Sequence, residues 1–324
     1  MSLDTLQRIK EEQGRILVIS HVDPDGDAVG SVLGLYLFLR HLGKEVDAVL
    51  KDPPPAYLDF LPGLNELLPE PRPPYALTLV VDASGFDRTG FDEMAGLGDL
   101  VRIDHHITGH HYGPWDYLDP KAPSCGLLIY RLIRAYDREA FTPQIATCLY
   151  TALLTDTGAF KYLNRDPEVF DAARDLTQLG ANPGEIARLV FQRRRLEAVR
   201  LQARALQSLQ LALEGRVAYV VVREEDLQAA GAEPSDTEGL ANLVLSIRGV
   251  AVGVMFLQDQ DHWKISFRGK GVVDLALIAE AFGGGGHKNA SGCRVPGPED
   301  RVVAAVLQAL AQALKGLDLS SFAL

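Results

Sequence analysis

Short, nearly continuous apolar runs alternate with longer amphipathic or loop segments through the first third of the chain. The runs that predict β-strands are residues 15–20, 45–50, 76–81 and 100–104. Strands that are apolar on both faces suit a buried parallel sheet, and the segments between them can supply the crossovers. The proline-rich segment 51–75 predicts a surface loop that carries one short helix. We therefore expect an α/β domain with a parallel sheet in this half.

Helical spacing of apolar residues dominates the middle of the chain, at 125–136, at 143–155 and through most of 167–210. Because the stretch 187–210 contains no glycine or proline, we interpret it as a helical connector between two domains. Three consecutive arginines, 193–195, could face a substrate cleft, but a solvated helix face is the favoured interpretation.

A second set of elements begins after Glu214. Strands are predicted at 216–222, 250–258 and 262–269, and helices at 274–282 and 299–315. We therefore expect an α/β protein with two domains and a cleft between them. The parallel-sheet domain covers residues 1–185, the connector 186–212, and a smaller α/β domain 213–324.

The composition is that of an ordinary globular protein. The 324 residues exceed the usual size of one hydrophobic core, and 47% of them are hydrophobic and 23% charged. The longest apolar stretch, 32–39, is far too short to span a bilayer, and the charged N-terminus has no apolar signal core. We therefore expect a cytoplasmic protein with no membrane partner. Three widely separated cysteines without CxxC spacing suit reduced, buried thiols.

The net charge of −11 restricts the class of substrate. An acidic surface repels polyphosphate chains. It also lacks the basic residues that would displace counterions from a phosphate backbone, so no long duplex nucleic acid is expected as a partner. Any phosphate substrate must be captured locally, by metal ions and a few arginines.

Acidic and histidine residues follow three of the four predicted strands in the N-terminal half. They are His21, Asp23, Asp25 and Asp27 after the first strand, Asp82 after the third, and Asp104, His105 and His106 after the fourth. The carboxyl ends of parallel strands meet at one edge of the sheet, where open α/β sheets place their ligand sites. Burying several carboxylates together is unfavourable unless cations balance them. The set therefore predicts a metal site.

Each element taken singly has a structural alternative. Asp27 could be the N-cap of the helix that follows it, because aspartate is favoured in turns and at helix N-termini. Asp156, just beyond the helical segment 143–155, fits a cap or a metal ligand equally well. Three strand ends that present Asp and His together are harder to explain as caps. Oxygen and imidazole donors without thiolate favour Mn²⁺ or Mg²⁺ over a structural zinc.

These residues resemble the ordered motifs of a known family, the DHH phosphoesterases. The matching motifs are H-x-x-x-D-x-D at 21–27, the lone Asp82 after a strand, D-H-H at 104–106 and Asp-Thr-Gly at 156–158. The resemblance implies two Mn²⁺ ions, one held by His21, Asp25 and Asp82 and the other by Asp27, Asp82, His105 and Asp156, with Mg²⁺ as a possible substitute. It also implies that His106 contacts the substrate phosphate and that Asp104 orients the neighbouring imidazole. Asp23 occupies a variable position of the motif and is left out of the ligand set.

A glycine-rich segment marks the C-terminal half. The run GGGGHKNASG at 283–292 would by itself favour a flexible turn, although its backbone N–H groups could approach an anion closely. Together with Phe-Arg-Gly at 267–269, it resembles the signature of the DHH-associated C-terminal domain. That resemblance implies that Arg268, Gly285, Gly286 and His287 bind the terminal phosphate or base of a nucleotide across the cleft. Gly269 departs from the more usual arginine-serine pairing, so a hydroxyl contact after Arg268 is not carried over.

In length and layout the chain is most similar to the family branch of nanoRNases and pAp phosphatases. The resemblance implies hydrolysis of short RNA oligonucleotides or dinucleotides to mononucleotides, and removal of the 3′-phosphate from pAp. A pair of metal ions would activate water as the nucleophile, so no covalent enzyme intermediate is needed. Alternatives are an exonuclease on longer single-stranded nucleic acid, a phosphodiesterase for linear or cyclic dinucleotides, and a nucleotide sensor without turnover. The oligomeric state stays open, a homodimer included.

Overall fold

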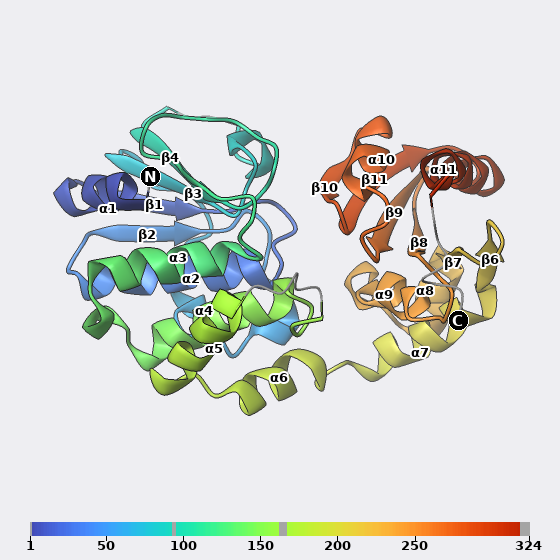
Figure 1. Cartoon of the computed structure of the whole chain (residues 1–324), viewed down its shortest axis with the longest axis horizontal. Coiled ribbons are helices and arrows are strands. Elements are labelled where there is room, and N and C mark those ends of the chain that lie inside the picture. Colours follow the sequence, from blue (N-terminus) through green and yellow to red (C-terminus); the bar gives the residue numbers. More distant parts are fainter. Residues whose placement is uncertain (1, 93–94, 162–166, 318–324) are drawn as a thin grey trace. The chain divides into compact units, whose positions relative to one another are not determined.

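The computed structural model describes residues 2–92, 95–161 and 167–317 of the chain, and it divides between Arg193 and Arg194 into two compact units. Each unit has its own sheet (Figure 1). The expected α/β class, with a parallel sheet in the N-terminal part and a second sheet in the C-terminal part, is confirmed. Within the described residues, no helix has the length and apolar character that crossing a bilayer requires.

The first unit contains a five-stranded parallel sheet in the order β2-β1-β3-β4-β5. Its strands are β1 (Ile16–Ile19), β2 (Val46–Val49), β3 (Leu77–Val81), β4 (Asp99–Asp104) and β5 (Tyr117–Leu118). The first four coincide with the predicted runs, and every residue of β1 and β3 is buried. The two-residue strand β5 is too short to leave a periodic signal in the sequence.

Helices cover one face of this sheet in two layers (Figure 1). The helices of the unit are α1 (Ser2–Glu11), α2 (Gly26–His41), α3 (Cys125–Tyr136), α4 (Pro143–Asp156), α5 (Pro167–Gln178) and α6 (Pro183–Phe191). Helices α2 and α3 pack on the strands, and α4 packs on α2 and α3. The other face of the sheet is covered by loops and the 3₁₀ turn η3 (Phe86–Arg88), through Tyr75, Phe86 and Leu97.

The close approach of α2 to α4 depends on a glycine. A Cβ atom on Gly30 would lie 2.6 Å from the carbonyl oxygen of Cys148, so only glycine permits this spacing. Side-chain caps define where α3 and α4 begin: Ser124 accepts a hydrogen bond from Leu127 N, and Thr142 accepts one from Ile145 N. The packing and caps bring the first turn of α2 next to the last turn of α4.

Two sequence expectations for this unit were wrong in detail. The proline-rich segment contains two 3₁₀ turns, η1 (Ala56–Leu58) and η2 (Leu64–Glu66), where one short helix was expected. Pro62 and Gly63 separate the turns, and Gly63 has a φ of 84° that a helix cannot accommodate.

The connector is also not one helix. Helix α6 ends at Phe191 and α7 (Leu196–Ala205) begins at Leu196, so the arginines 193–195 do not form a helix face. Each of the three has a specific partner instead. Arg193 binds the Asp59 carboxylate through both terminal nitrogens, at 2.6 and 2.8 Å. Arg194 donates to Gln202, and Arg195 lies 3.1 Å from Glu233.

The second unit contains a six-stranded mixed sheet in the order β10-β11-β9-β8-β7-β6, in which only β7 and β8 run parallel. Its strands are β6 (Gln210–Ala212), β7 (Val217–Val222), β8 (Val252–Asp259), β9 (His262–Gly269), β10 (Gly285–His287) and β11 (Ala290–Pro296). Its helices are α7, α8 (Glu224–Ala230), α9 (Leu240–Leu245), α10 (Leu275–Ala281) and α11 (Glu299–Leu314), with the 3₁₀ turns η5 (Leu206–Ser208) and η6 (Pro234–Thr237).

Helices cover both faces of this second sheet. Along β8, Val254 and Phe256 pack against α10 and α11, whereas Met255 and Leu257 pack against α7, α8 and α9. This alternation follows from the two-residue period of a strand. It explains why β8 reads as a continuous apolar run in the sequence.

Candidate metal centre

The acidic and histidine residues that follow the strands of the first unit lie together in the fold. Three overlapping groups have potential ligand atoms within 4.8 Å of one another. The groups are His21, Asp25 and Asp82; Asp27, His105 and Asp156; and Asp82, Asp104, His105 and His106. The carboxyl ends of β1, β3 and β4 supply most of these residues, and the ends of α2 and α4, which meet at Gly26 and Thr155, supply the rest. Asp23 is exposed and belongs to none of the groups.

Asp82 lies between the two sets of side chains. Its Oδ1 is 3.4 Å from His105 Nε2, and its Oδ2 is 3.9 Å from His21 Nε2. Oδ1 is buried and accepts no hydrogen bond from the residues that the structure describes. The backbone of Asp82 is left-handed, with φ of 52°, a conformation that is uncommon for residues other than glycine and clusters at functional sites. A buried carboxylate oxygen without a donor is the kind of atom that a metal ion would satisfy.

The imidazoles are oriented by backbone carbonyl groups. His105 Nδ1 lies 3.0 Å from the carbonyl oxygen of Ala122, and His21 Nδ1 lies 2.7 Å from that of Val22. A carbonyl oxygen can only accept, so Nδ1 carries the proton in both rings. Nε2 of each ring therefore faces the carboxylates, and once deprotonated it is the nitrogen that could bind a metal ion, as in metal-binding histidines.

Asp25, not Asp27, is the N-cap of α2. The Asp25 Oδ1 accepts hydrogen bonds from Asp27 N at 3.0 Å and Ala28 N at 3.1 Å, which leaves its other oxygen for the group with His21. Asp27 lies inside the first turn, so the capping alternative considered for it is wrong. Its carboxylate accepts instead from Cys125 N, Gly126 N and Ser31 Oγ. The two backbone donors belong to the first turn of α3, whose dipole favours a negative charge.

Asp156 is the last residue of α4, and its Oδ2 lies 3.6 Å from His105 Nε2. The C-cap of this helix is Thr157. A carboxylate at a helix C-terminus is opposed by the helix dipole, so Asp156 has no stabilising role as a cap. Between the two alternatives that the sequence left equal, the geometry favours a ligand.

The crowding of carboxylates and imidazoles shifts several pKa values in the cluster. Burial, with the neighbouring charges of Asp82 and Asp156, raises the pKa of Asp27 well above its usual value. Burial, with Asp25 and Asp82, raises the pKa of Asp156 to about 7. Burial alone would lower the pKa of His105, but the surrounding carboxylates raise it well above the usual value. Carboxyl groups that resist ionisation and an imidazole that resists deprotonation are expected where carboxylates are crowded without a cation.

The donor set fits divalent cations that prefer oxygen and imidazole ligands, as Mn²⁺ and Mg²⁺ do. Ligands in adjacent positions around such an ion, each about 2.1 Å from it, lie roughly 3 Å apart. The Nε2–oxygen separations of 3.4 to 3.7 Å around His105 are close to that spacing.

Asp104, like Asp27, has a hydrogen-bond donor for each of its oxygens. Its Oδ1 accepts from His105 N at 2.8 Å and from His106 Nδ1 at 2.7 Å. Its Oδ2 accepts from the guanidinium of Arg102. Burial would lower the pKa of His106, but the hydrogen bond to Asp104 raises it. We did not expect Arg102 from the sequence, although an arginine inside an otherwise apolar strand is the signal that could have identified it.

The residues predicted to bind substrate lie in the second unit, around β9 and β10. Arg268 is half-buried in β9, in the same cross-strand row as Ala290 of β11 and His287 of β10. The side chain of His287 lies outside what the structure describes. The glycine run is not a flexible turn, because residues 285–287 pair with β11 as a strand.

The glycines of this run have different steric environments. A Cβ on Gly286 would lie 2.6 Å from the carbonyl oxygen of Ala290, and its φ is 134°. A Cβ on Gly285 would meet no atom within 4 Å. Packing therefore requires glycine at 286 but not at 285, which leaves the backbone of Gly285 open to close approach by a ligand.

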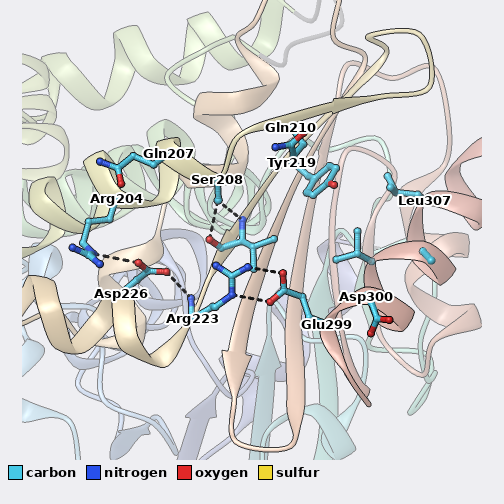
Figure 2. A pocket seen from close by; sticks show the side chains of 13 residues that line it. Arg204, Gln207, Ser208, Gln210, Tyr219, Arg223, Asp226, Glu299, Asp300 and Leu307 are labelled. Carbon is cyan, nitrogen blue, oxygen red and sulfur yellow. Dashed lines mark hydrogen bonds and ion pairs between the residues drawn. The ribbon is translucent and has the colours of Figure 1, made fainter.

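A separate pocket of about 860 Å³ in the second unit does not include these residues. Figure 2 shows that its arginines are paired with carboxylates. Arg223 binds Glu299 through two nitrogens, at 2.8 and 2.6 Å, and Arg204 lies 3.2 Å from Asp226. Because these guanidinium groups are already neutralised, the pocket is a poor candidate for a phosphate site.

Two domain families match the chain. The DHH family, N-terminal domain, matches residues 15–153, and the DHHA1 domain matches residues 214–316. A protein of Thermus thermophilus named bifunctional oligoribonuclease and PAP phosphatase NrnA is 34% identical over 310 residues, which cover 94% of this chain and 92% of that protein. A Bacillus subtilis protein of the same name is 29% identical, with coverage of 86% and 89%.

Solved structures agree on the fold. The crystal structure of an exopolyphosphatase-related protein from Bacteroides fragilis superimposes with a TM-score of 0.88 at 28% identity, and 96% of each chain is covered. The exonuclease RecJ bound to manganese has a TM-score of 0.50 at 18% identity, with coverage of 98% of this chain and 97% of the other. The second likeness is one of fold alone.

Proposed function

This chain belongs to the DHH family, whose members are metal-dependent phosphoesterases, and we propose that it hydrolyses short RNA oligonucleotides to mononucleotides and converts pAp to AMP. The names of its relatives from Thermus thermophilus and Bacillus subtilis support both activities. One observation carries the proposal: strand-end carboxylates and imidazoles far apart in the sequence converge around Asp82 Oδ1, a buried atom without a hydrogen bond among the described residues.

We assign the convergent side chains to two Mn²⁺ sites. The first contains His21, Asp25 and Asp82, and the second contains Asp27, Asp82, His105 and Asp156. In this assignment Asp82 would help to hold both ions, because each of its oxygens faces a different imidazole. When bound, a pair of such ions makes water nucleophilic at neutral pH and stabilises the charge on the phosphoryl oxygens. Mg²⁺ is an alternative with the same ligand preference.

His106 is proposed to contact the phosphate. Its Nδ1 donates to Asp104, so in this proposal Nε2 is the ring nitrogen that faces a substrate oxygen. Because the pKa of His106 is raised, the ring can carry the second proton that a hydrogen bond to phosphate needs. Asp104 fixes the orientation of this ring and does not itself contact the substrate.

The second unit is proposed to bind the end of the nucleotide through Arg268, Gly285, Gly286 and His287. Two observations support this. A Cβ on Gly285 would meet no atom within 4 Å, and Arg268 of β9 pairs with Ala290 of β11, which in turn pairs with β10. In this proposal residues 1–185 form the catalytic domain, 186–212 the connector and 213–324 the substrate-binding domain. The net charge of −11 disfavours long nucleic acid, so short substrates are expected.

A rate series on a 5′-phosphorylated dinucleotide, a pentamer, a 20-mer and pAp tests this function. The Mn²⁺-loaded protein should release mononucleotides from the dinucleotide and pentamer and AMP from pAp, and EDTA should abolish both reactions. Absence of mononucleotide release at micromolar enzyme would rule the proposal out. Equal cleavage of the 20-mer and the dinucleotide would instead identify an exonuclease on longer strands. Tight dinucleotide binding without turnover would indicate a sensor.

A further inference from the structure

Arg102 is an arginine in the interior of the first unit. It lies in β4, its exposed fraction is 1%, and it is among the largest fully buried side chains. A buried guanidinium is costly unless every donor finds an acceptor. Each of the three nitrogens of Arg102 has an acceptor: it donates to the carbonyl oxygens of Ala83 at 2.9 Å, Thr108 at 2.7 Å and His110 at 3.2 Å, and to Asp104 Oδ2.

These acceptors belong to two different loops of the candidate metal centre. Ala83 directly follows Asp82 at the end of β3, whereas Thr108 and His110 follow the histidines at the end of β4. A single planar guanidinium therefore connects the two loops. Lysine could not replace it, because its ammonium is a point charge with three donors and no fixed fork.

The close packing of Arg102 against the second loop leaves no room for a side chain at Gly109. A Cβ at that position would lie 2.6 Å from Arg102 Nη1 and 2.0 Å from the carbonyl oxygen of Ser84, and the backbone φ is 129°. Any other residue would push the guanidinium or the loop away. Residue 109 must be glycine for Arg102 to bond both loops.

The loop contacts immobilise the guanidinium, and the guanidinium in turn holds Asp104. With Oδ2 bound to Arg102, the Asp104 carboxylate has one fixed orientation, in which Oδ1 accepts from His106 Nδ1. The acceptor at Nδ1 determines which ring nitrogen carries the proton and where Nε2 points. The chain of contacts thus runs from three backbone carbonyls through Arg102 and Asp104 to His106.

We propose that Arg102 is a positioning residue that acts through Asp104 to hold the His106 imidazole with Nδ1 protonated and Nε2 directed to the substrate. Arg102 itself is buried too deeply to contact substrate. The inference rests on the proposed function, since it assigns His106 to the phosphate. It differs from a purely structural role, in which Arg102 would stabilise the unit without affecting His106 in particular.

Steady-state kinetics of Arg102→Lys on a 5′-phosphorylated dinucleotide, with saturating Mn²⁺, test the proposal. We expect kcat to fall about 10- to 100-fold, as is typical when a residue that orients a functional histidine is lost. KM should stay within about twofold, because the residues proposed to bind the end of the nucleotide lie in the second unit, whereas Arg102 lies in the first. The matched control is Arg131→Lys, a partly buried arginine of α3 paired with Asp119 and Glu168, whose kcat should stay near that of the wild type. An unchanged kcat in Arg102→Lys would overturn the proposal.

A double-mutant cycle separates positioning from general stabilisation. In a His106→Ala background, Arg102→Lys should lower kcat by less than about twofold further, because the route through the imidazole is already removed. An additive loss would assign Arg102 a structural role only. Gly109→Ala provides a second variant that keeps the arginine but displaces it, and it should reproduce the loss of kcat if Arg102→Lys folds poorly.

A measurement that does not depend on catalytic turnover tests the role of Arg102 separately from the proposed function. In ¹⁵N NMR of the Mg²⁺-loaded wild type, His106 should show a proton on Nδ1, and Arg102→Lys should show a mixture of ring states. If the wild type hydrolyses none of the substrates, the proposed function fails while this comparison still decides the role of Arg102. The same Nδ1-protonated signal in both proteins would overturn the positioning role.

Discussion

Asp27 and Cys125 are 98 residues apart in the sequence, yet the backbone N–H of Cys125 donates a 2.6 Å hydrogen bond to Asp27 Oδ2. The bond joins the first turn of α2 to the first turn of α3, and Gly126 N adds a second bond to Oδ1 at 2.9 Å. The Asp27 carboxylate is thereby held 3.7 Å from His105 Nε2. Helix packing, and not the local turn, determines where this acid points.

Asp82→Asn should lower kcat for dinucleotide hydrolysis by more than about 100-fold, beyond the loss typical of residues that only support a ligand. Asparagine also tolerates the left-handed backbone at this position, so the fold should be retained while a charged ligand oxygen is lost. Calorimetric titration should show weaker Mn²⁺ binding. The control is Asp87→Asn, an exposed acid on the adjacent turn η3, which should be neutral. Substantial activity in Asp82→Asn would show that the metal assignment is wrong.

Metal binding should stabilise the protein more at high pH than at low pH. The folded-state pKa of Asp156 is raised to about 7, above the ordinary value of 3.8, and that of His105 is raised as well. In both cases the folded state binds protons more tightly, so the metal-free protein should lose stability as pH rises through the raised pKa values. Ligation needs the deprotonated groups, so the metal competes with these protons.

Thermal unfolding with Mn²⁺ and with EDTA, at pH 5.5 and pH 8, measures this competition. The increase in Tm on adding Mn²⁺ should be larger at pH 8, because ligand-induced stabilisation grows with the ratio of free metal to its Kd. In Asp156→Asn, which has no carboxyl group to titrate, the difference between the two pH values should shrink. An equal Tm increase at both pH values would contradict the expectation.

Gly285→Ala should affect substrate binding, whereas Gly286→Ala should affect stability. Gly285 has open space for a Cβ, so its substitution should leave stability nearly unchanged and raise KM for pAp by obstructing the approach of the phosphate. Gly286 has positive φ and a carbonyl oxygen 2.6 Å from the added Cβ, so its substitution should cost at least about 1 kcal/mol of unfolding free energy. Urea denaturation and steady-state kinetics on both variants check the pair. An unaltered KM in Gly285→Ala would remove that residue from the proposed phosphate site.

Gly30→Ala should weaken both the fold and the metal centre. The added methyl group would meet the Cys148 carbonyl oxygen at 2.6 Å and force α2 away from α4, at a cost of about 1–3 kcal/mol. Because Asp27 and Asp156 lie at the meeting ends of these helices, Mn²⁺ affinity should fall too. Gly184→Ala in α6 is the control, since its nearest neighbour is 3.7 Å away and alanine should stabilise that helix. Denaturation midpoints measure the change in stability, and Mn²⁺ titration measures the change in affinity.

Residue patterns alone predicted the main strands, the two units, and the acids and histidines at the strand ends. Apolar runs with acids and histidines at their ends are local signals, because alternation and strand length depend on neighbouring residues only. The order of motifs from His21 to Asp156 indicated the family, which the relatives confirm. No property beyond the order and type of residues was needed for these conclusions.

Packing between elements determines which atoms face one another. Asp25 instead of Asp27 caps α2, because Asp27 is engaged by the first turn of α3, far away in the chain. The glycine run is a strand because β11 lies beside it, and Arg102 is satisfied because two separate loops present carbonyls to it. Such outcomes depend on hydrogen-bond partners that helix and sheet packing brings together. For Asp27 these partners lie 98 and 99 residues away, and local propensity holds no information about them.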